Sequence, residues 1–178
     1  LFGEKYKNNE KTKHDALIAF GKGSQLRWDD DLFIKEISKI KIVPFDNVWV
    51  DPDIIPTSVP KWMKSATFER KMYEKLQVAI IRPGVGTATE AILSGAKIFA
   101  FYEDKNMEMK ENAFNLEKMG FGTDSKHISV AWKMANNFSI NFKKQVDQRN
   151  IFTTLNPSGA DDVAKAIIEN IRIKRKLK

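Results

Sequence analysis

The stretch IIRPGVGTATEAILSG, residues 80–95, determines how the rest of the chain is interpreted. It begins with apolar residues, continues through a glycine-bearing turn and ends in a run with the composition of a helix. A helix that begins directly after such a turn presents free backbone amides and the positive end of its dipole to any anion at the turn. The stretch therefore predicts a strand, a phosphate-binding turn and a helix, in that order.

Two common phosphate loops do not match the glycines of this chain. The dinucleotide pattern G-x-G-x-x-G starts at Gly84 but has Thr89 where its third glycine belongs. The GKGS sequence at residues 21–24 is not a Walker A loop, because Ala16 stands where that motif has its first glycine and Gly23 follows the lysine. A nicotinamide, flavin or P-loop site is therefore disfavoured. Both turns are still expected at the carboxyl ends of strands, where α/β sheets bind ligands.

Glu90 has two interpretations. Thr87 and Glu90 have the spacing of a capping box, in which the glutamate bonds the backbone amide of the threonine at the start of a helix. A carboxylate at this place is also a natural acceptor for sugar hydroxyls, as the acidic residue of dinucleotide sites is. Local spacing alone favours the capping box.

Short apolar runs alternate with amphipathic stretches along the chain, which indicates buried strands alternating with helices. The expected strands are residues 15–20, 41–45, 47–50, 78–81 and 96–102. The further expected helices are residues 29–40, 66–77, 107–120, 128–146 and 160–173. This alternation predicts an α/β fold, a Rossmann-like parallel sheet with helices on both faces. The proline-rich residues 51–62 are expected to form a loop. The domain is expected to span residues 15–171, between a charged start (1–14) and a basic tail (172–178).

The composition limits the classes of function. The sequence has 178 residues and no cysteine, which excludes disulfides and cysteine-ligated metal sites, and no run is apolar enough for a membrane span. The net charge of +7 lies at the ends, with +2 in residues 1–14 and +5 in residues 172–178, so the neutral body does not indicate a nucleic-acid partner. We expect a cytoplasmic protein whose basic tail gives weak association with a membrane surface at most. Because the chain starts with Leu1, we also expect it to be part of something longer.

Two separated blocks resemble the donor-binding, C-terminal half of GT-B glycosyltransferases. They are RPGVGTATEAILSGAKIFAF (residues 82–101) and EMKENAFNLEKMGFG (residues 108–122). The similarity is to the enzyme that adds N-acetylglucosamine to the lipid-linked peptidoglycan precursor and to UDP-glycosyltransferases in general. ALIAFGKGS, residues 16–24, resembles the first strand and glycine/serine loop of the same half. The residues that match the two blocks are Arg82, Gly84, Gly86, Thr87, Glu90, Ala91, Glu108, Asn112 and Ala113.

The resemblance implies roles for the matching residues. Residues 84–87 would cradle the diphosphate of a nucleotide sugar, Glu90 would bind the ribose hydroxyls, and Glu108 would meet the hydroxyls of the sugar. Lys22 and Arg82 would stabilise charge on the leaving diphosphate without a bound metal or other cofactor. The candidate binding residues are Gly23, Ser24, Arg82, Gly84, Val85, Gly86, Thr87, Glu90 and Glu108. The alternative for Arg82 is an ordinary structural ion pair.

Some positions depart from the pattern of that family, and others have a plainer interpretation. Pro83 stands where a small residue is usual, and Met109 where the family often has a glutamine that bonds the sugar. His14 and His127 are interpreted as surface residues, so no catalytic residue and no metal site are assigned. Asp51 and Asp53 flank a proline and are interpreted as turn formers.

The function implied by the resemblance is sugar-donor binding in a glycosyltransferase that uses a nucleotide diphosphate sugar, with UDP as the expected nucleotide. The acceptor-binding N-terminal half would be supplied by another domain or by a separate subunit. A nucleotide-sugar epimerase or hydrolase on the same fold is one alternative. A non-catalytic nucleotide-binding or scaffold module is the other.

Overall fold

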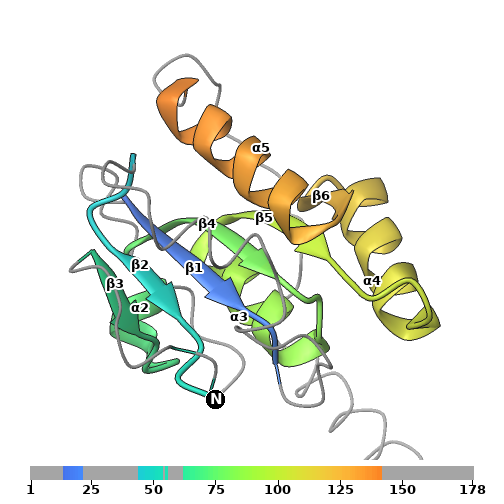
Figure 1. Ribbon diagram of the computed structural model, residues 1–178, viewed down its shortest axis with the longest axis horizontal. Helices are drawn as coiled ribbons and strands as arrows, with labels where there is room; N and C mark the ends of the chain where they lie inside the picture. The colour runs from blue at the N-terminus through green and yellow to red at the C-terminus, as the bar shows by residue number, and fades with distance from the viewer. Residues whose placement is uncertain (1–13, 22–43, 54, 56–61, 142–178) are drawn as a thin grey trace, which may run out of the picture. The chain divides into compact units, whose positions relative to one another are not determined.

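The computed structural model describes residues 14–21, 44–53, 55 and 62–141, which all lie in one compact unit (Figure 1). Their strands form a parallel, six-stranded sheet in the order β3-β2-β1-β4-β5-β6. The strands are β1 (Asp15–Ala19), β2 (Val48–Val50), β3 (Met63–Ser65), β4 (Leu76–Ile81), β5 (Lys97–Phe101) and β6 (Gly122–Lys126). The chain therefore adds strands outward on one side of β1 and then crosses to the other side to begin β4, as in Rossmann-type sheets.

The central strands are apolar because both of their faces are covered. Every residue of β1 and of β4 is buried. In register, Ile18 of β1 lies beside Ile80 of β4, which lies beside Phe99 of β5. Parallel strands covered on both faces have continuous apolar runs of this kind. The expected strands at residues 15–20, 47–50, 78–81 and 96–102 are confirmed, with small changes of boundary. Of the segment expected to be extended at residues 41–45, the structure describes only residues 44 and 45, and they are not in a strand.

Helices lie on both faces of the sheet, as predicted (Figure 1). The described helices are α2 (Arg70–Tyr73), α3 (Val85–Ser94), α4 (Met107–Lys118) and α5 (Ile128–Asn141). Helix α5 crosses one face, and α3 lies on the opposite face, where it contacts β4 and β5. Helix α4 packs mainly beside β6.

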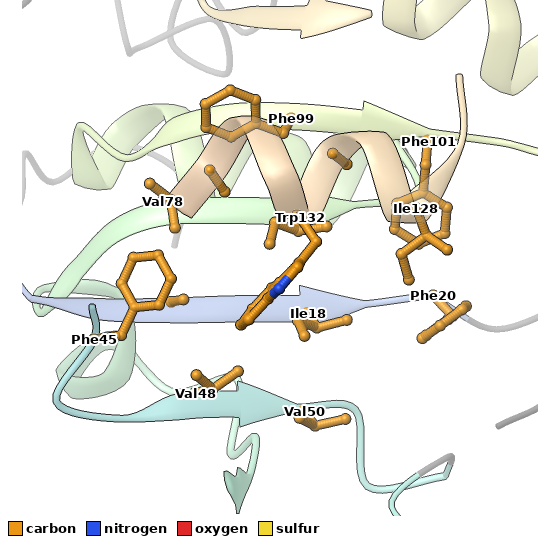
Figure 2. Close-up of a cluster of buried hydrophobic side chains, with 14 of the residues drawn as sticks. Ile18, Phe20, Phe45, Val48, Val50, Val78, Phe99, Phe101, Ile128 and Trp132 are labelled. Carbon is orange, nitrogen blue, oxygen red and sulfur yellow. The ribbon is translucent and has the colours of Figure 1, made fainter. Parts of the chain in front are cut away.

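A cluster of buried apolar side chains lies between α5 and the sheet (Figure 2). Ile128, Trp132 and Ala135 follow one another at helical spacing, and each is at least 94% buried. The Trp132 ring lies 6.1 Å from the Phe45 ring, centroid to centroid. Helix α5 therefore packs across β4, β5 and β6, and its apolar face also reaches the cluster that contains Ile18 of β1.

The structure differs from the sequence prediction at the weaker elements. The helix expected at residues 66–77 is reduced to α2, because Phe68 adopts a left-handed φ of 53° and residues 76–77 belong to β4. The strands β3 and β6 were not predicted. Both are edge strands that are partly exposed, so neither has the apolar run of a central strand.

Several predicted features lie outside the described residues. They are the helices expected at residues 29–40 and 160–173, most of the proline-rich loop, and the two charged ends.

Candidate functional site

The strand order places a topological switch point between β1 and β4. From β1 the chain continues to β2 on one side, and from β4 it continues to β5 on the other. Open α/β sheets bind ligands outside the carboxyl ends of the strands at such a point, because the loops there diverge. The candidate site is therefore formed by the residues that follow β1 and β4.

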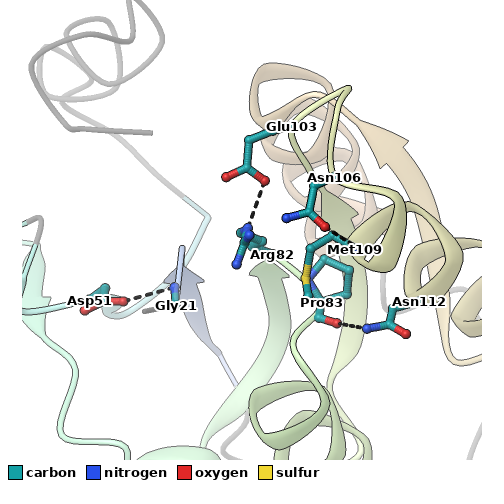
Figure 3. A network of polar contacts seen from close by, with 8 residues as sticks. All are labelled: Gly21, Asp51, Arg82, Pro83, Glu103, Asn106, Met109 and Asn112. Carbon is teal, nitrogen blue, oxygen red and sulfur yellow. Dashed lines mark hydrogen bonds and ion pairs between the residues drawn. The ribbon is translucent and has the colours of Figure 1, made fainter. Parts of the chain in front are cut away.

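The loop after β1 is held in place by Asp51, which follows β2. The backbone amide of Gly21 donates to Oδ2 of Asp51 at 3.3 Å (Figure 3). The amide of Asp53 donates to Oδ1 of the same carboxylate at 3.2 Å. Asp51 is 7% exposed. The prediction that Asp51 forms a turn is confirmed, and the same carboxylate also anchors the neighbouring loop. The candidate residues Gly23 and Ser24, together with Lys22, lie outside the described residues.

The loop after β4 belongs to the first of the two sequence blocks that resemble GT-B glycosyltransferases, and it is hydrogen-bonded to the second block. The amide of Arg82 donates to the carbonyl of Ala19 at 2.9 Å, which extends the β1–β4 pairing to the start of the loop. The side-chain amide of Asn112, on α4, donates to the carbonyl of Pro83 at 3.0 Å (Figure 3). Asn112 and Pro83, which are 29 positions apart in the sequence, are therefore in contact next to Gly84, the N-cap of α3.

Helix α3 begins without a side-chain cap. Its N-cap is Gly84, in an extended conformation (φ −66°, ψ 141°), and the first helical hydrogen bond runs from the Ala88 amide to the Gly84 carbonyl at 3.0 Å. Among the described residues, none accepts a hydrogen bond from the amides of Val85, Gly86 or Thr87. Unsatisfied amides at a helix N-terminus, with the helix dipole behind them, favour an anion.

The capping-box interpretation of Thr87 and Glu90 is wrong. A capping box needs its Ser or Thr at the N-cap, and in α3 that position is Gly84. Thr87 is already the third residue of the helix, and Glu90 lies almost a full turn further on. The other interpretation, in which Glu90 accepts hydrogen bonds from ligand hydroxyls, stays a prediction.

Gly84 and Gly86 leave space at the start of α3. No heavy atom lies within 4 Å of a Cβ built at either glycine, and neither has a φ in the left-handed region. Neither backbone conformation nor packing against the described residues therefore requires glycine at these positions. The absence of side chains does let a ligand approach the amides closely.

Arg82 pairs with Glu103, which follows β5. Nε of Arg82 lies 2.8 Å from Oε2 of Glu103, and the two side chains are 10% and 19% exposed (Figure 3). The ion pair that was the alternative interpretation of Arg82 is therefore present. It uses the Nε donor, and because a guanidinium has further N–H groups, it is compatible with a second contact to phosphate.

Glu90 lies on the same face of α3 as Gly86, because the two residues are four positions apart. Its side chain is partly buried. Burial, and secondarily the negative charge of Glu90, raise the pKa of the Tyr73 phenol to about 12. The Glu90 carboxylate is therefore close enough to the buried Tyr73 of α2 to disfavour ionisation of its phenol.

The second block forms α4 from its second residue onward and ends at the first residue of β6. Asn106 is the N-cap, and its side chain accepts a hydrogen bond from the Met109 amide at 3.1 Å (Figure 3). Glu108 is exposed in the first turn of the helix. Met109 is 5% exposed and packs in the interior. Met109, which departs from the family pattern, is therefore a packing residue, whereas Glu108, which matches the pattern, is accessible to a ligand.

Sequence reasoning missed some residues at the carboxyl edge of the sheet. Met107, the first residue of α4, is 69% exposed. Phe68 follows β3 at the same edge with a strained backbone and is 39% exposed. A sequence pattern gives no signal for these exposures, because an apolar residue at a helix start is ordinarily assigned to the core.

The histidines and acidic residues do not form a metal site within the described part of the chain. No group of three or more His, Asp or Glu residues is arranged to hold a metal ion among residues that the structure describes. His14 and His127 are both exposed, as predicted. Within the same residues, no helix has the length and apolar character needed to cross a membrane.

The comparisons with known proteins identify the architecture. No family model and no curated protein matches the sequence. The solved structure of the glycotransferase of kitacinnamycin matches with a TM-score of 0.63 and 14% identity over 93% of this chain. The calicheamicin glycosyltransferase CalG4 matches with a TM-score of 0.57, at the same identity and coverage. The chain shares its fold with these glycosyltransferases.

The chain spans less than half of the length of these glycosyltransferases. The match covers 45% of each of the two proteins. The predicted fold class, an α/β Rossmann-like sheet that matches half of a GT-B fold, is therefore confirmed.

Proposed function

We propose that this chain is the donor-binding domain of a glycosyltransferase that takes a sugar from a nucleoside diphosphate sugar. The observation that carries the proposal is the uncapped start of α3 at the switch point of the sheet. The amides of Val85, Gly86 and Thr87 lie there without partners among the described residues, and Gly86 leaves room for a ligand. A diphosphate supplies the negative charge that this arrangement favours.

The remaining candidate residues have complementary roles in this proposal. Glu90, one turn below Gly86 on the same face, accepts hydrogen bonds from the ribose hydroxyls. Arg82, fixed by Glu103, supplies positive charge to the diphosphate as it leaves. Glu108, exposed at the start of α4, meets hydroxyls of the sugar. Gly23 and Ser24, which lie outside the described residues, would by the resemblance contact the phosphates as well.

Charge stabilisation in this proposal comes from backbone amides, the helix dipole and Arg82. These groups need no metal ion, so sugar-donor binding is expected to be unchanged by EDTA. The acceptor site and the group that activates the acceptor belong to the other half of the enzyme, either a second domain or a separate subunit. The length of the matched glycosyltransferases, about twice that of this chain, supports this division.

The experiment that tests the proposed function is calorimetric titration of the chain with UDP, GDP, ADP, dTDP and NAD in the presence of EDTA. Selective binding of one nucleoside diphosphate, with UDP expected, would support it. Binding of NAD alone would overturn it and would assign the turn to the dinucleotide class. Failure of every nucleoside diphosphate to bind would also count against it.

A further inference from the structure

The Pro83–Gly84 peptide unit, which leads into α3, is hydrogen-bonded at both of its ends. Its carbonyl oxygen, from Pro83, accepts from the Asn112 side chain at 3.0 Å. Its N–H, from Gly84, donates to the carbonyl of Arg82 at 2.7 Å. The orientation of this peptide plane is therefore set by one contact within the loop and by one contact from α4.

These two hydrogen bonds matter because the residues themselves leave the peptide plane free to rotate. Proline fixes its own φ, but its ψ and both dihedral angles of Gly84 remain soft, since glycine has no Cβ to restrict rotation. Without the contact from α4, the plane could rotate and turn the Pro83 oxygen towards the start of α3. A carbonyl oxygen there would repel an anion, because it carries partial negative charge.

Asn112 is itself held firmly. It lies on α4 beside the buried residues Ala113 and Met109, and the start of the helix is capped by Asn106. The hydrogen bond to Pro83 therefore transmits the position of a packed helix to the loop after β4. No corresponding side chain caps α3 itself.

We infer that Asn112 is a positioning residue of the sugar-donor site, which orients the Pro83–Gly84 peptide so that the amides of residues 85–87 face the diphosphate. This inference rests on the proposed function. Asn112 touches no ligand in this account and acts only through the peptide. It should therefore influence the phosphate part of the ligand and leave the nucleoside part alone.

The test compares Asn112→Ala and Asn112→Asp with the unaltered chain. Asn112→Asp keeps the shape of the side chain but replaces the donating NH₂ group with an oxygen. The matched control is Asn115→Ala, one turn further along α4, where the Asn115 side chain bonds only the exposed Glu111 among the described residues. Each protein is titrated with the nucleoside diphosphate that binds best and with the corresponding nucleoside, and its thermal unfolding is recorded.

The expected result is that Asn112→Ala weakens binding of the nucleoside diphosphate about tenfold, the scale of one lost hydrogen bond, with nucleoside affinity unchanged. Asn112→Asp should weaken it at least as much, and Asn115→Ala should change neither affinity. Faster hydrogen exchange of the Gly84 amide in both Asn112 variants would support the same mechanism without any ligand.

Three outcomes would overturn the inference. Equal affinity of the Asn112 variants and the unaltered chain for the nucleoside diphosphate would remove the positioning role while leaving the proposed function intact. Equal loss of affinity for nucleoside and diphosphate would show a general structural role. Failure of the unaltered chain to bind any nucleoside diphosphate would overturn the proposed function and this inference together.

Discussion

Gly86 lacks a side chain at a place where the fold would accept one. A Cβ there would meet no heavy atom within 4 Å, and the residue lies in the first turn of a helix with ordinary backbone angles. We predict that Gly86→Ala stabilises the folded chain by roughly 0.5 kcal/mol, because alanine is the better helix former. The same methyl group should obstruct phosphate and weaken nucleoside diphosphate binding by about tenfold or more, which is about 1.4 kcal/mol. Thermal unfolding and calorimetric titration measure the two effects.

Gly95 provides the matched control for this substitution. It ends α3 with a left-handed φ of 76°, which only glycine adopts readily. Gly95→Ala should therefore destabilise the chain by about 1 kcal/mol and leave ligand affinity unchanged. Loss of stability without loss of binding in Gly86→Ala would show that this glycine serves the fold rather than a ligand.

Glu90 is the second residue whose role separates function from structure. We predict that Glu90→Gln weakens nucleoside binding roughly tenfold, as expected when a hydroxyl loses a charged acceptor. The substitution also removes one of the two causes that raise the pKa of Tyr73, so the phenol should titrate below its value of about 12. Glu111→Gln, on the exposed face of α4, is the control. Unchanged nucleoside affinity alongside the lowered tyrosine pKa would refute the ribose role.

At the scale of elements, the start of α3 differs from the start of α4. Helix α4 has an asparagine cap, whereas α3 has glycine at the same position and amides without partners among the described residues. We predict that Gly84→Asp supplies the missing cap and leaves stability unchanged or higher by a few tenths of a kcal/mol. Its carboxylate would occupy the amides and repel phosphate, so nucleoside diphosphate binding should fall by more than about tenfold.

The control for that substitution is Gly84→Ala, which adds a methyl group but no charge and no cap. Both variants are compared by thermal unfolding and by titration with the same nucleoside diphosphate. If Gly84→Asp binds as tightly as Gly84→Ala, the amides at the start of α3 are not the phosphate contacts.

The elements also show what could be predicted from the sequence. The central strands β1, β4 and β5 were predicted because burial on both faces requires continuous apolar runs. The turn after β4 was predicted because its glycines precede a helical run. Strand β6 was not predicted, because an edge strand with the sequence GTDSK has no apolar run to signal it.

The parts of the site that could not be predicted depend on tertiary contacts. The N-cap of α3 lies at Gly84 rather than Thr87, because the loop after β4 turns tightly through Pro83 and starts the helix early. The hydrogen bond from Asn112 to Pro83 joins residues that only the packing of α4 brings together. The spacing of residues in the sequence predicts neither the position of this N-cap nor this hydrogen bond.

At the scale of the whole molecule, α5 fixes the sheet that presents the site. Trp132 is 6% exposed and packs in the cluster between α5 and the central strands (Figure 2). We predict that Trp132→Ala lowers the free energy of unfolding by about 3–5 kcal/mol, as removal of a large buried side chain does. Urea unfolding measures this change. Val130→Ala, on the same helix but 40% exposed, should cost much less; equal losses for both would contradict the packing described for α5.

The central claim is that a nucleoside diphosphate binds at the amides that begin α3. The most direct measurement is the change in amide ¹H and ¹⁵N chemical shifts of the labelled chain when the best-binding nucleoside diphosphate is added. The account predicts that the largest changes occur at Val85, Gly86 and Thr87, with smaller changes at the end of β1. Shifts confined to α5 or β6, with the amides at the start of α3 unmoved, would contradict it.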